Sequence, residues 1–137
     1  MTGRESGSRV ADPLFLLDTD ICIYALKALF PPLRRRIESF EPGQVVTSSI
    51  AYAEVMKGLA SEGEERRCRA EAFFNVVEVL PFDRAAASAY ALIPFKRASF
   101  DRLIAAHALA ASLTLITNNE KDFRGVEGLI VQNWTEQ

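Results

Sequence analysis

The sequence has little of the chemistry that cysteine and histidine provide: two cysteines and one histidine among 137 residues. Cys22 and Cys68 lie in helix-like segments, and neither has a partner at metal-ligand spacing, which argues against a disulfide framework and against a zinc site. The single histidine, His107, argues against a histidine metal cluster, and a buried packing role suits it better than catalysis. No apolar run reaches the roughly 20 residues that span a bilayer. These absences favour a protein of the reducing cytoplasm without membrane contact.

Residues 1–13 contrast with the rest of the chain. They are mostly polar and lack the apolar stretch of a secretory signal, so we expect a flexible N-terminal tail. Residues 14–137 have the length of one domain, and a hydrophobic fraction of 49% over the whole chain is enough to form a core. No repeat or linker divides this segment, which predicts a single domain.

The net charge is −2, which does not suit a protein that binds nucleic acid by bulk attraction. A nucleic-acid partner would have to meet local basic patches. Three candidates are 34–36, 66–69 and 96–102, although each is equally compatible with a solvated face of a helix.

Short apolar segments alternate with segments of helical periodicity. The predicted strands are 14–17, 44–47, 76–80, 113–117 and 129–131, and the predicted helices are 19–29, 33–40, 49–59, 64–74, 84–92 and 100–111. This alternation predicts an α/β domain with a mainly parallel central sheet. In such sheets functional side chains gather at the carboxyl ends of the strands.

Three carboxylates stand out because their sequence neighbours are apolar or small. Asp18 closes the first strand, Glu54 lies within the helix 49–59, and Asp101 begins the helix 100–111. A buried carboxylate needs a cap, a cationic partner or a metal. Each acid also has a simpler interpretation, respectively a helix cap, an exposed helical residue and a complement to the helix dipole.

The predicted topology brings these three acids to one edge of the sheet, where they would repel one another without a cation. Oxygen ligands suit Mg²⁺, with Mn²⁺ as a substitute. A divalent ion held in this way supports phosphodiester hydrolysis, because it lowers the pKa of water and stabilises charge on the leaving oxygen. The sequence leaves open whether one or two ions bind.

Four segments resemble toxins of the VapC family, which contain a PIN domain. They are Leu-Leu-Asp-Thr-Asp-Ile-Cys-Ile-Tyr, Ser-Ser-Ile-Ala-Tyr-Ala-Glu-Val-Met-Lys-Gly, Phe-Asp-Arg-Leu-Ile-Ala-Ala-His-Ala-Leu-Ala and Leu-Ile-Thr-Asn-Asn-Glu-Lys-Asp-Phe. The resemblance runs in the family's order from about Leu14 to Trp134. It implies a PIN-like three-layer α/β/α sandwich and a metal-dependent endoribonuclease acting on RNA, with transfer or ribosomal RNA as the expected substrate.

The family's acidic residues fall on Asp18, Glu54 and Asp101 as expected metal ligands and catalytic residues. A fourth aspartate of many members falls on Asn119, which adds no charge. Asp122, three residues later, is an alternative for this fourth catalytic position, or it caps the turn. The resemblance thus assigns three acidic positions of the site and leaves the fourth open between Asn119 and Asp122.

Other residues near these motifs have weaker indications. Thr19 and Thr117 follow strands directly and are placed to hydrogen-bond a ligand carboxylate or to cap. Lys96 and Arg97 lie in a segment that is shorter than in relatives, and they are candidates for contacting RNA phosphates from the rim of the site. Trp134 and the phenylalanines are interpreted as core or interface residues rather than as base-stacking platforms.

The resemblance also implies partners. A VapB-like antitoxin would neutralise the enzyme, often by inserting a basic side chain among the acids, and the apolar helices 21–29 and 50–59 offer it a groove. Operator DNA would be bound only through the antitoxin, and a homodimer is expected.

Two other functions remain open at this stage. The Asp18-Thr19-Asp20 sequence after an apolar strand also resembles the start of phosphatases of the haloacid-dehalogenase type, in which Asp18 would be the nucleophile. Alternatively, Asn119 suggests a degenerate PIN domain that serves only as a binding module.

Overall fold

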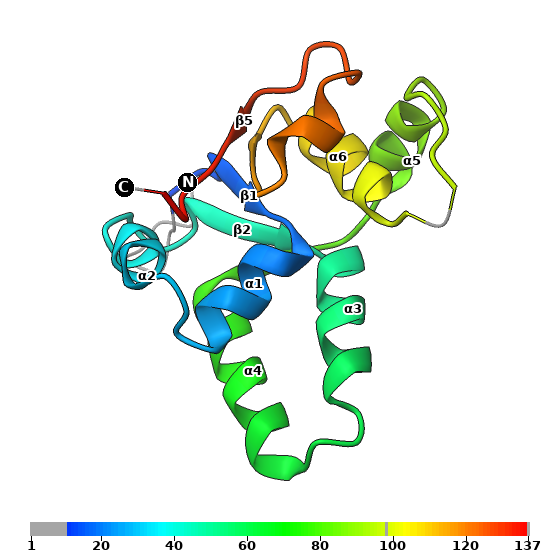
Figure 1. The fold of residues 1–137 in the computed structure, drawn as a ribbon. Coiled ribbons are helices and arrows are strands. Elements are labelled where there is room, and N and C mark those ends of the chain that lie inside the picture. The colour runs from blue at the N-terminus through cyan, green and yellow to red at the C-terminus, as the bar shows by residue number, and fades with distance from the viewer. Residues whose placement is uncertain (1–10, 98, 137) are drawn as a thin grey trace, which may run out of the picture.

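The computed structural model describes residues 11–97 and 99–136, and it contains one five-stranded sheet in which every strand pair is parallel. The strand order is β3-β2-β1-β4-β5, so the first strand lies at the centre (Figure 1). The elements in chain order are β1 (Phe15–Leu17), α1 (Thr19–Leu26), α2 (Pro31–Glu38), β2 (Val45–Ser48), α3 (Ser49–Leu59), α4 (Glu64–Val76), β3 (Glu78–Leu80), α5 (Arg84–Tyr90), α6 (Asp101–Ala110), β4 (Thr114–Ile116), the 3₁₀ helix η1 (Glu120–Phe123) and β5 (Val131–Gln132). The predicted α/β class with a parallel sheet is confirmed.

Helices cover both faces of the sheet, so its central strands are apolar on both sides. Leu16 and Leu17 are both fully buried, but they belong to different cores because successive strand residues point to opposite faces. Leu17 packs with residues of α1, α2 and α4, whereas Leu16 packs with residues of α6 and η1. Figure 1 shows α1 and α4 on the side of the sheet opposite α5 and α6, which gives the predicted three-layer sandwich.

Three helices that begin after strands or turns have a side-chain cap. Asp18 caps α1 by accepting from the amide of Ile21, and Ser48 caps α3 by accepting from the amide of Ile50. Asp83 caps α5 in the same way. These caps satisfy amides that the helix itself leaves unpaired, and they fix where the chain turns from strand into helix.

Several predicted boundaries are wrong by a few residues. We expected the two prolines to stop the helix 19–29, but that helix ends at Leu26, and Pro31 instead begins α2, since proline suits the first helical turn. Val76 was assigned to a strand but ends α4, and the final strand is 131–132 rather than 129–131. The segment predicted as a loop, 118–122, overlaps the 3₁₀ helix η1, which was not predicted because a short polar segment gives no periodic signal.

The expected flexible tail, residues 1–13, falls mainly on residues outside the described part of the chain. Of its last three residues, Ala11 donates a backbone hydrogen bond to the carbonyl of Pro42. Within residues 11–97 and 99–136, no helix combines the length and the apolar character needed to cross a membrane.

Candidate active site

Asp18 stands at the carboxyl end of the central strand and is 4% exposed. Its backbone amide continues the sheet by donating to the carbonyl of Ile116, 3.0 Å away on β4. Its Oδ1 accepts from the amide of Ile21 at 2.9 Å. The capping interpretation of Asp18 is therefore confirmed, and the same contact fixes the carboxylate at the edge of the sheet, where it can also serve a ligand.

Burial raises the pKa of Asp18 to about 7, because desolvation disfavours the charged form. A hydrogen bond from the Thr117 side chain and the amide of Ile21 act in the opposite direction. The charges of Asp20 and Asp101 raise the pKa further. Asp18 is thus a buried acid beside two other acids, which is the environment in which a bound cation would be most favourable.

Glu54 lies on α3, half-buried, with its carboxylate turned towards the first turn of α1. The Thr19 hydroxyl donates a hydrogen bond to Glu54 Oε1. Desolvation raises the pKa of Glu54, this hydrogen bond lowers it, and the charges of Asp101 and Asp20 raise it. The prediction for Thr19 is confirmed, since its hydroxyl donates to Glu54. Thr117 is close enough to Asp18 to lower its pKa.

Asp101 begins α6, where its amide donates to Ser99 Oγ at 3.2 Å. Its pKa is raised, first by desolvation and then by the charges of Asp20 and Asp122. Lys96 and Arg102 lower it. Asp101 therefore shares the electrostatic environment of Asp18 and Glu54, although about eighty residues separate the first and last of these acids.

Asp122 and Asn119 occupy the turn after β4. The Asn119 side-chain amide donates to Asp122 Oδ2 at 2.5 Å, and Lys96 Nζ lies 3.3 Å from the same oxygen. Arg102 donates to the backbone carbonyl of Asp122 at 3.0 Å. Asp122 contributes charge at Asp101, whereas Asn119 is exposed and holds Asp122 in place.

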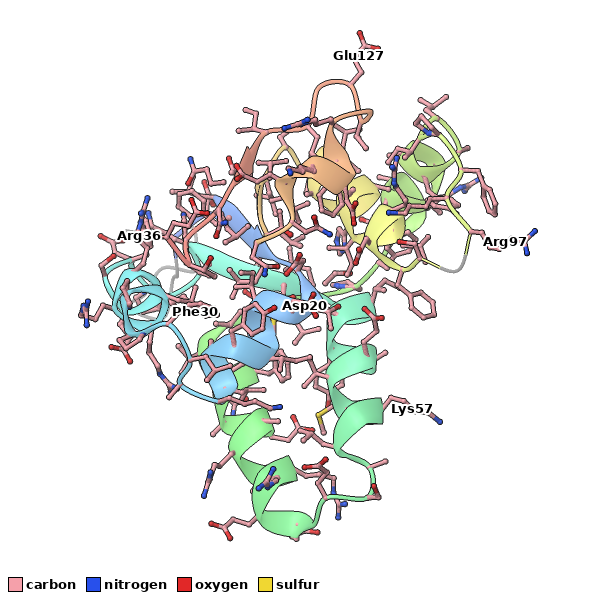
Figure 2. The ribbon with its side chains drawn as sticks, in the orientation of Figure 1. Asp20, Phe30, Arg36, Lys57, Arg97 and Glu127 are labelled. Atoms are coloured by element: carbon pink, nitrogen blue, oxygen red, sulfur yellow. The ribbon has the colours of Figure 1, made fainter. Side chains whose placement is uncertain are left out.

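Asp20 is a site acid that the sequence analysis did not include in the predicted metal site. It is exposed on the first turn of α1, and its charge raises the pKa of Asp18, Glu54 and Asp101 alike. Figure 2 shows Asp20 at the start of α1, near the top of α3. The second aspartate of Asp-Thr-Asp was the available signal, but we had connected it only with the phosphatase alternative.

These acids form a set of oxygen donors at one sheet edge, and the rise of their pKa values reflects mutual repulsion as well as burial. Such a set fits a hard divalent cation, which prefers oxygen ligands and would relieve the repulsion. In the described part of the chain, no three His, Cys, Asp or Glu side chains are gathered tightly enough to hold an ion as they stand. Binding would therefore require side-chain rotations at this edge.

The other residues that the sequence analysis named lie away from the acids or are already paired. His107 is buried, with Nδ1 2.8 Å from Ser48 Oγ, and Trp134 is 2% exposed in the core, as predicted for both. The basic residues of α4 pair with glutamates in the same region: Arg66 with Glu62, Arg67 with Glu64 and Arg69 with Glu65. Not all phenylalanines lie in the core, since Phe30, Phe95 and Phe100 are exposed.

A parallel α/β/α sandwich with acids at the carboxyl edge of its central strands is the architecture of a metal-dependent nuclease domain. The family model of the PIN domain matches residues 15–129, and the chain belongs to this family. PIN-domain nucleases depend on divalent metal. The membership supports the predicted nuclease against the phosphatase alternative.

Several curated relatives match over nearly their full length. The tRNA(fMet)-specific endonuclease VapC of Shigella flexneri is 33% identical over 130 residues, which is 88% of this chain and 98% of the relative. Ribonuclease VapC2 of Rickettsia felis is 28% identical over 88% of this chain and 98% of the relative. The predicted resemblance to VapC ribonucleases is confirmed.

Solved structures agree with this placement. DNA-bound VapBC from Salmonella typhimurium has a TM-score of 0.81 at 28% identity, covering 89% of this chain and 98% of the matched chain. VapBC2 from Rickettsia felis, bound to a DNA fragment from its promoter, has a TM-score of 0.79 at 27% identity, covering 88% and 98%. The predicted PIN-like fold is confirmed by these neighbours.

Proposed function

We propose that this chain is the toxin of a VapBC-type toxin–antitoxin pair and hydrolyses RNA in a Mg²⁺-dependent reaction, with Mn²⁺ as a substitute. The observation that carries the proposal is the convergence of Asp18, Glu54 and Asp101 on one electrostatic environment at the carboxyl edge of the sheet. The specificity of the Shigella relative supports transfer RNA as the substrate class. The cation would be held by Asp18, Asp101 and Glu54, with Asp20 adjacent.

The bound ion and the residues of the site have different roles in the proposed hydrolysis. When bound, the divalent ion would polarise a water molecule and neutralise charge on the scissile phosphate. The Thr19 hydroxyl donates a hydrogen bond to Glu54, and Thr117 lies beside Asp18, so these threonines position the two carboxylates for a bound ion. The low dielectric around buried Asp18 strengthens its attraction for a cation. The expected products carry 5′-phosphate and 3′-hydroxyl ends.

The direct test is cleavage of tRNA(fMet) by the purified chain, followed on a denaturing gel. We expect cleavage with Mg²⁺ or Mn²⁺ and none after chelation with EDTA. Absence of cleavage of any cellular RNA with either ion would contradict the proposal and favour the binding-module alternative. A binding module would also show no Asp18-dependent affinity for Mn²⁺ in a titration.

For the fourth position of the site, we propose that Asp122 acts and that Asn119 positions it. Asp122→Asn is expected to lower RNA cleavage by roughly 10–100-fold, the usual effect of losing an outer-shell partner of a metal site. The matched control is Glu120→Gln, which removes an exposed acid from the same short helix. The assignment is wrong if both variants cleave RNA at the same rate. Asn119→Ala should produce a smaller loss than Asp122→Asn.

The groove predicted for the antitoxin has a counterpart in a cavity of about 680 Å³ between α1, α3 and α4. Its lining combines apolar with charged residues: Ile23, Leu26, Lys27, Ala28, Glu54, Val55, Gly58, Leu59, Glu62, Arg66 and Arg69. Because Glu54 lines it, the groove reaches the acidic site. We propose that an amphipathic antitoxin segment occupies it and places a basic side chain at the acids. The complexes of the structural neighbours support a VapB-type partner and operator DNA bound through it.

Gly58 offers a test of this groove, since a Cβ added there meets nothing within 4 Å. Gly58→Ala should keep antitoxin binding and stabilise the helix by up to about 1 kcal/mol. Gly58→Trp should fill the groove and weaken binding by about 30-fold or more, as for loss of a central contact. Isothermal titration with the VapB-type antitoxin measures both. Equal affinities of the two variants would place the antitoxin elsewhere.

Two further expectations also remain proposals. The free thiols of Cys22 and Cys68 support the cytoplasm as the compartment. The homodimer rests on family resemblance, and light scattering of the purified chain tests it.

A further inference from the structure

The segment that leads from α5 into α6 exposes large apolar side chains beside the acidic site. Phe95 is 79% exposed and Phe100 is 55% exposed. Large exposed aromatic side chains next to a polar site are candidates for an interaction surface. We call Phe95, Lys96, Arg97 and Phe100 the aromatic rim.

Two side chains, Lys96 and Arg102, connect the segment of the aromatic rim to the active site. Lys96 Nζ lies 3.3 Å from Asp122 Oδ2. Arg102 joins the two sides, because it donates to the carbonyl of Pro94 at 3.4 Å and to the carbonyl of Asp122 at 3.0 Å. Phe100 is followed directly by Asp101. A ligand on the rim would therefore extend to the acids without a gap.

The charge of the rim distinguishes it from the basic patch on α4. Residues 84–100 contain no aspartate or glutamate, while the arginines of α4 are paired with glutamates. Within the described part of the chain, Arg97 forms no ion pair, and Figure 2 shows its side chain directed away from the body of the molecule. Lys96 brings a positive charge to within ion-pair distance of the acidic edge.

We propose that the aromatic rim binds a single-stranded segment of the RNA substrate, with bases stacked on Phe95 and Phe100 and phosphates held by Lys96 and Arg97. This inference rests on the ribonuclease function proposed above and adds the means by which the strand reaches the acids. A chain of net charge −2 with acids at its centre repels RNA, so adjacent cations are needed for the strand to approach. Aromatic faces interleaved with cations are the surface that unpaired nucleotides recognise.

The charge also favours RNA over a second copy of the chain as the occupant. A symmetric dimer across this surface would bring the same patch of both subunits together. Lys96 and Arg97 would then face their own copies, and like charges opposed in a contact are unfavourable. A polyanion with exposed bases satisfies both the charge and the aromatic rings.

The test compares binding of two fluorescein-labelled oligonucleotides to the rim variants in EDTA, which prevents cleavage. One is a mixed-sequence single-stranded RNA, and the other is an abasic strand of equal length and charge. Phe95→Ala and Phe100→Ala should each weaken binding of the RNA by roughly 5- to 100-fold, the effect of losing one stacked base, and leave the abasic strand unaffected. Lys96→Gln and Arg97→Gln should weaken both strands and reduce the salt dependence. Leu92→Ala, an exposed neighbour without a ring, is the control and should bind like wild type.

The outcomes separate this inference from the ribonuclease proposal. If wild-type protein cleaves RNA but the phenylalanine variants bind and cleave like wild type, the aromatic rim is wrong and the enzyme remains. If the variants lose both strands equally, stacking is wrong. If they change the mass in light scattering from dimer to monomer without changing RNA affinity, the surface is a subunit contact, and the inference is overturned. Unchanged melting temperatures, expected for exposed side chains, exclude misfolding.

Discussion

Asp18→Asn is expected to abolish RNA cleavage while leaving the fold intact. The variant loses the buried negative charge that would hold the cation, and several kcal/mol of transition-state stabilisation correspond to a loss of at least about 10³-fold. Asparagine caps helices as well as aspartate does, so the hydrogen bond to the amide of Ile21 is retained. Circular dichroism should therefore be unchanged, and expression in cells should no longer arrest growth.

The matched control for this experiment is Asp83→Asn. Asp83 caps α5 with the same geometry, accepting from the amide of Ala86 at 2.9 Å, but it is not among the acids of the site. The Asp83→Asn variant should cleave RNA like wild type. Equal activity of Asp18→Asn and wild type would remove Asp18 from the reaction, and equal loss in both variants would mean that the loss does not come from the charge at the site.

The stability of the metal-free protein should depend on pH through Asp18. Its ordinary pKa of 3.8 in the unfolded chain is raised to about 7 in the folded protein, so the folded state holds a proton that the unfolded state has released between these values. Stability therefore falls as pH rises from about 4 to about 7 and changes little above that range. The full loss from this group is on the order of 4 kcal/mol. Divalent metal should restore stability at pH 8 and have little effect at pH 5.

This effect is measured as the difference in free energy of unfolding between wild type and Asp18→Asn, by urea titration at pH 5 and pH 8 in EDTA. His107, Glu54 and Asp101 also have shifted pKa values and make stability depend on pH, but they titrate in both proteins, so their contributions largely cancel in the difference. Wild type should be the less stable of the two at pH 8, and the difference should shrink at pH 5. A difference that is the same at both pH values would show that Asp18 is ionised throughout.

The class of the fold and the centre of the site could be predicted from local patterns. The apolar run before Asp18 and its abrupt end at a carboxylate predicted a buried strand that delivers an acid to a sheet edge, and this is what β1 does. The motifs around Glu54 and Asp101 predicted the remaining acids because burying a carboxylate among apolar residues is costly unless it has a partner or a ligand. The two threonines were predicted from their position directly after strands.

The boundaries and the surroundings of the site could not be predicted in the same way. Pro31 follows a residue with positive φ, Phe30 at 55°, so the chain reverses there and begins a helix where we expected only an end. Asp20 is exposed one turn into α1, and nothing in a single sequence separates such an acid from a solvated one. The phenylalanines were expected in the core or in an interface, and Phe95 and Phe100 are not in the core, because α5 and α6 pack against each other and leave this segment outside.

By itself, the sequence determined the alternation of strands and helices, and it placed a carboxylate or a hydroxyl where a strand ends, because hydrophobic period and capping act over a few residues. Only the tertiary structure decided which of these groups meet. Parallel pairing of β1 with β2 and β4 aligns the ends of strands that are far apart in sequence, so that Asp18, Ser48 and Thr117 share one edge. Packing of α3 and α6 then brings Glu54 close enough to Asp101, and Asp101 close enough to Asp18, for their charges to interact. The electrostatic coupling of the acids is therefore a property of the fold, since Coulomb interactions depend on distance in space and not along the chain.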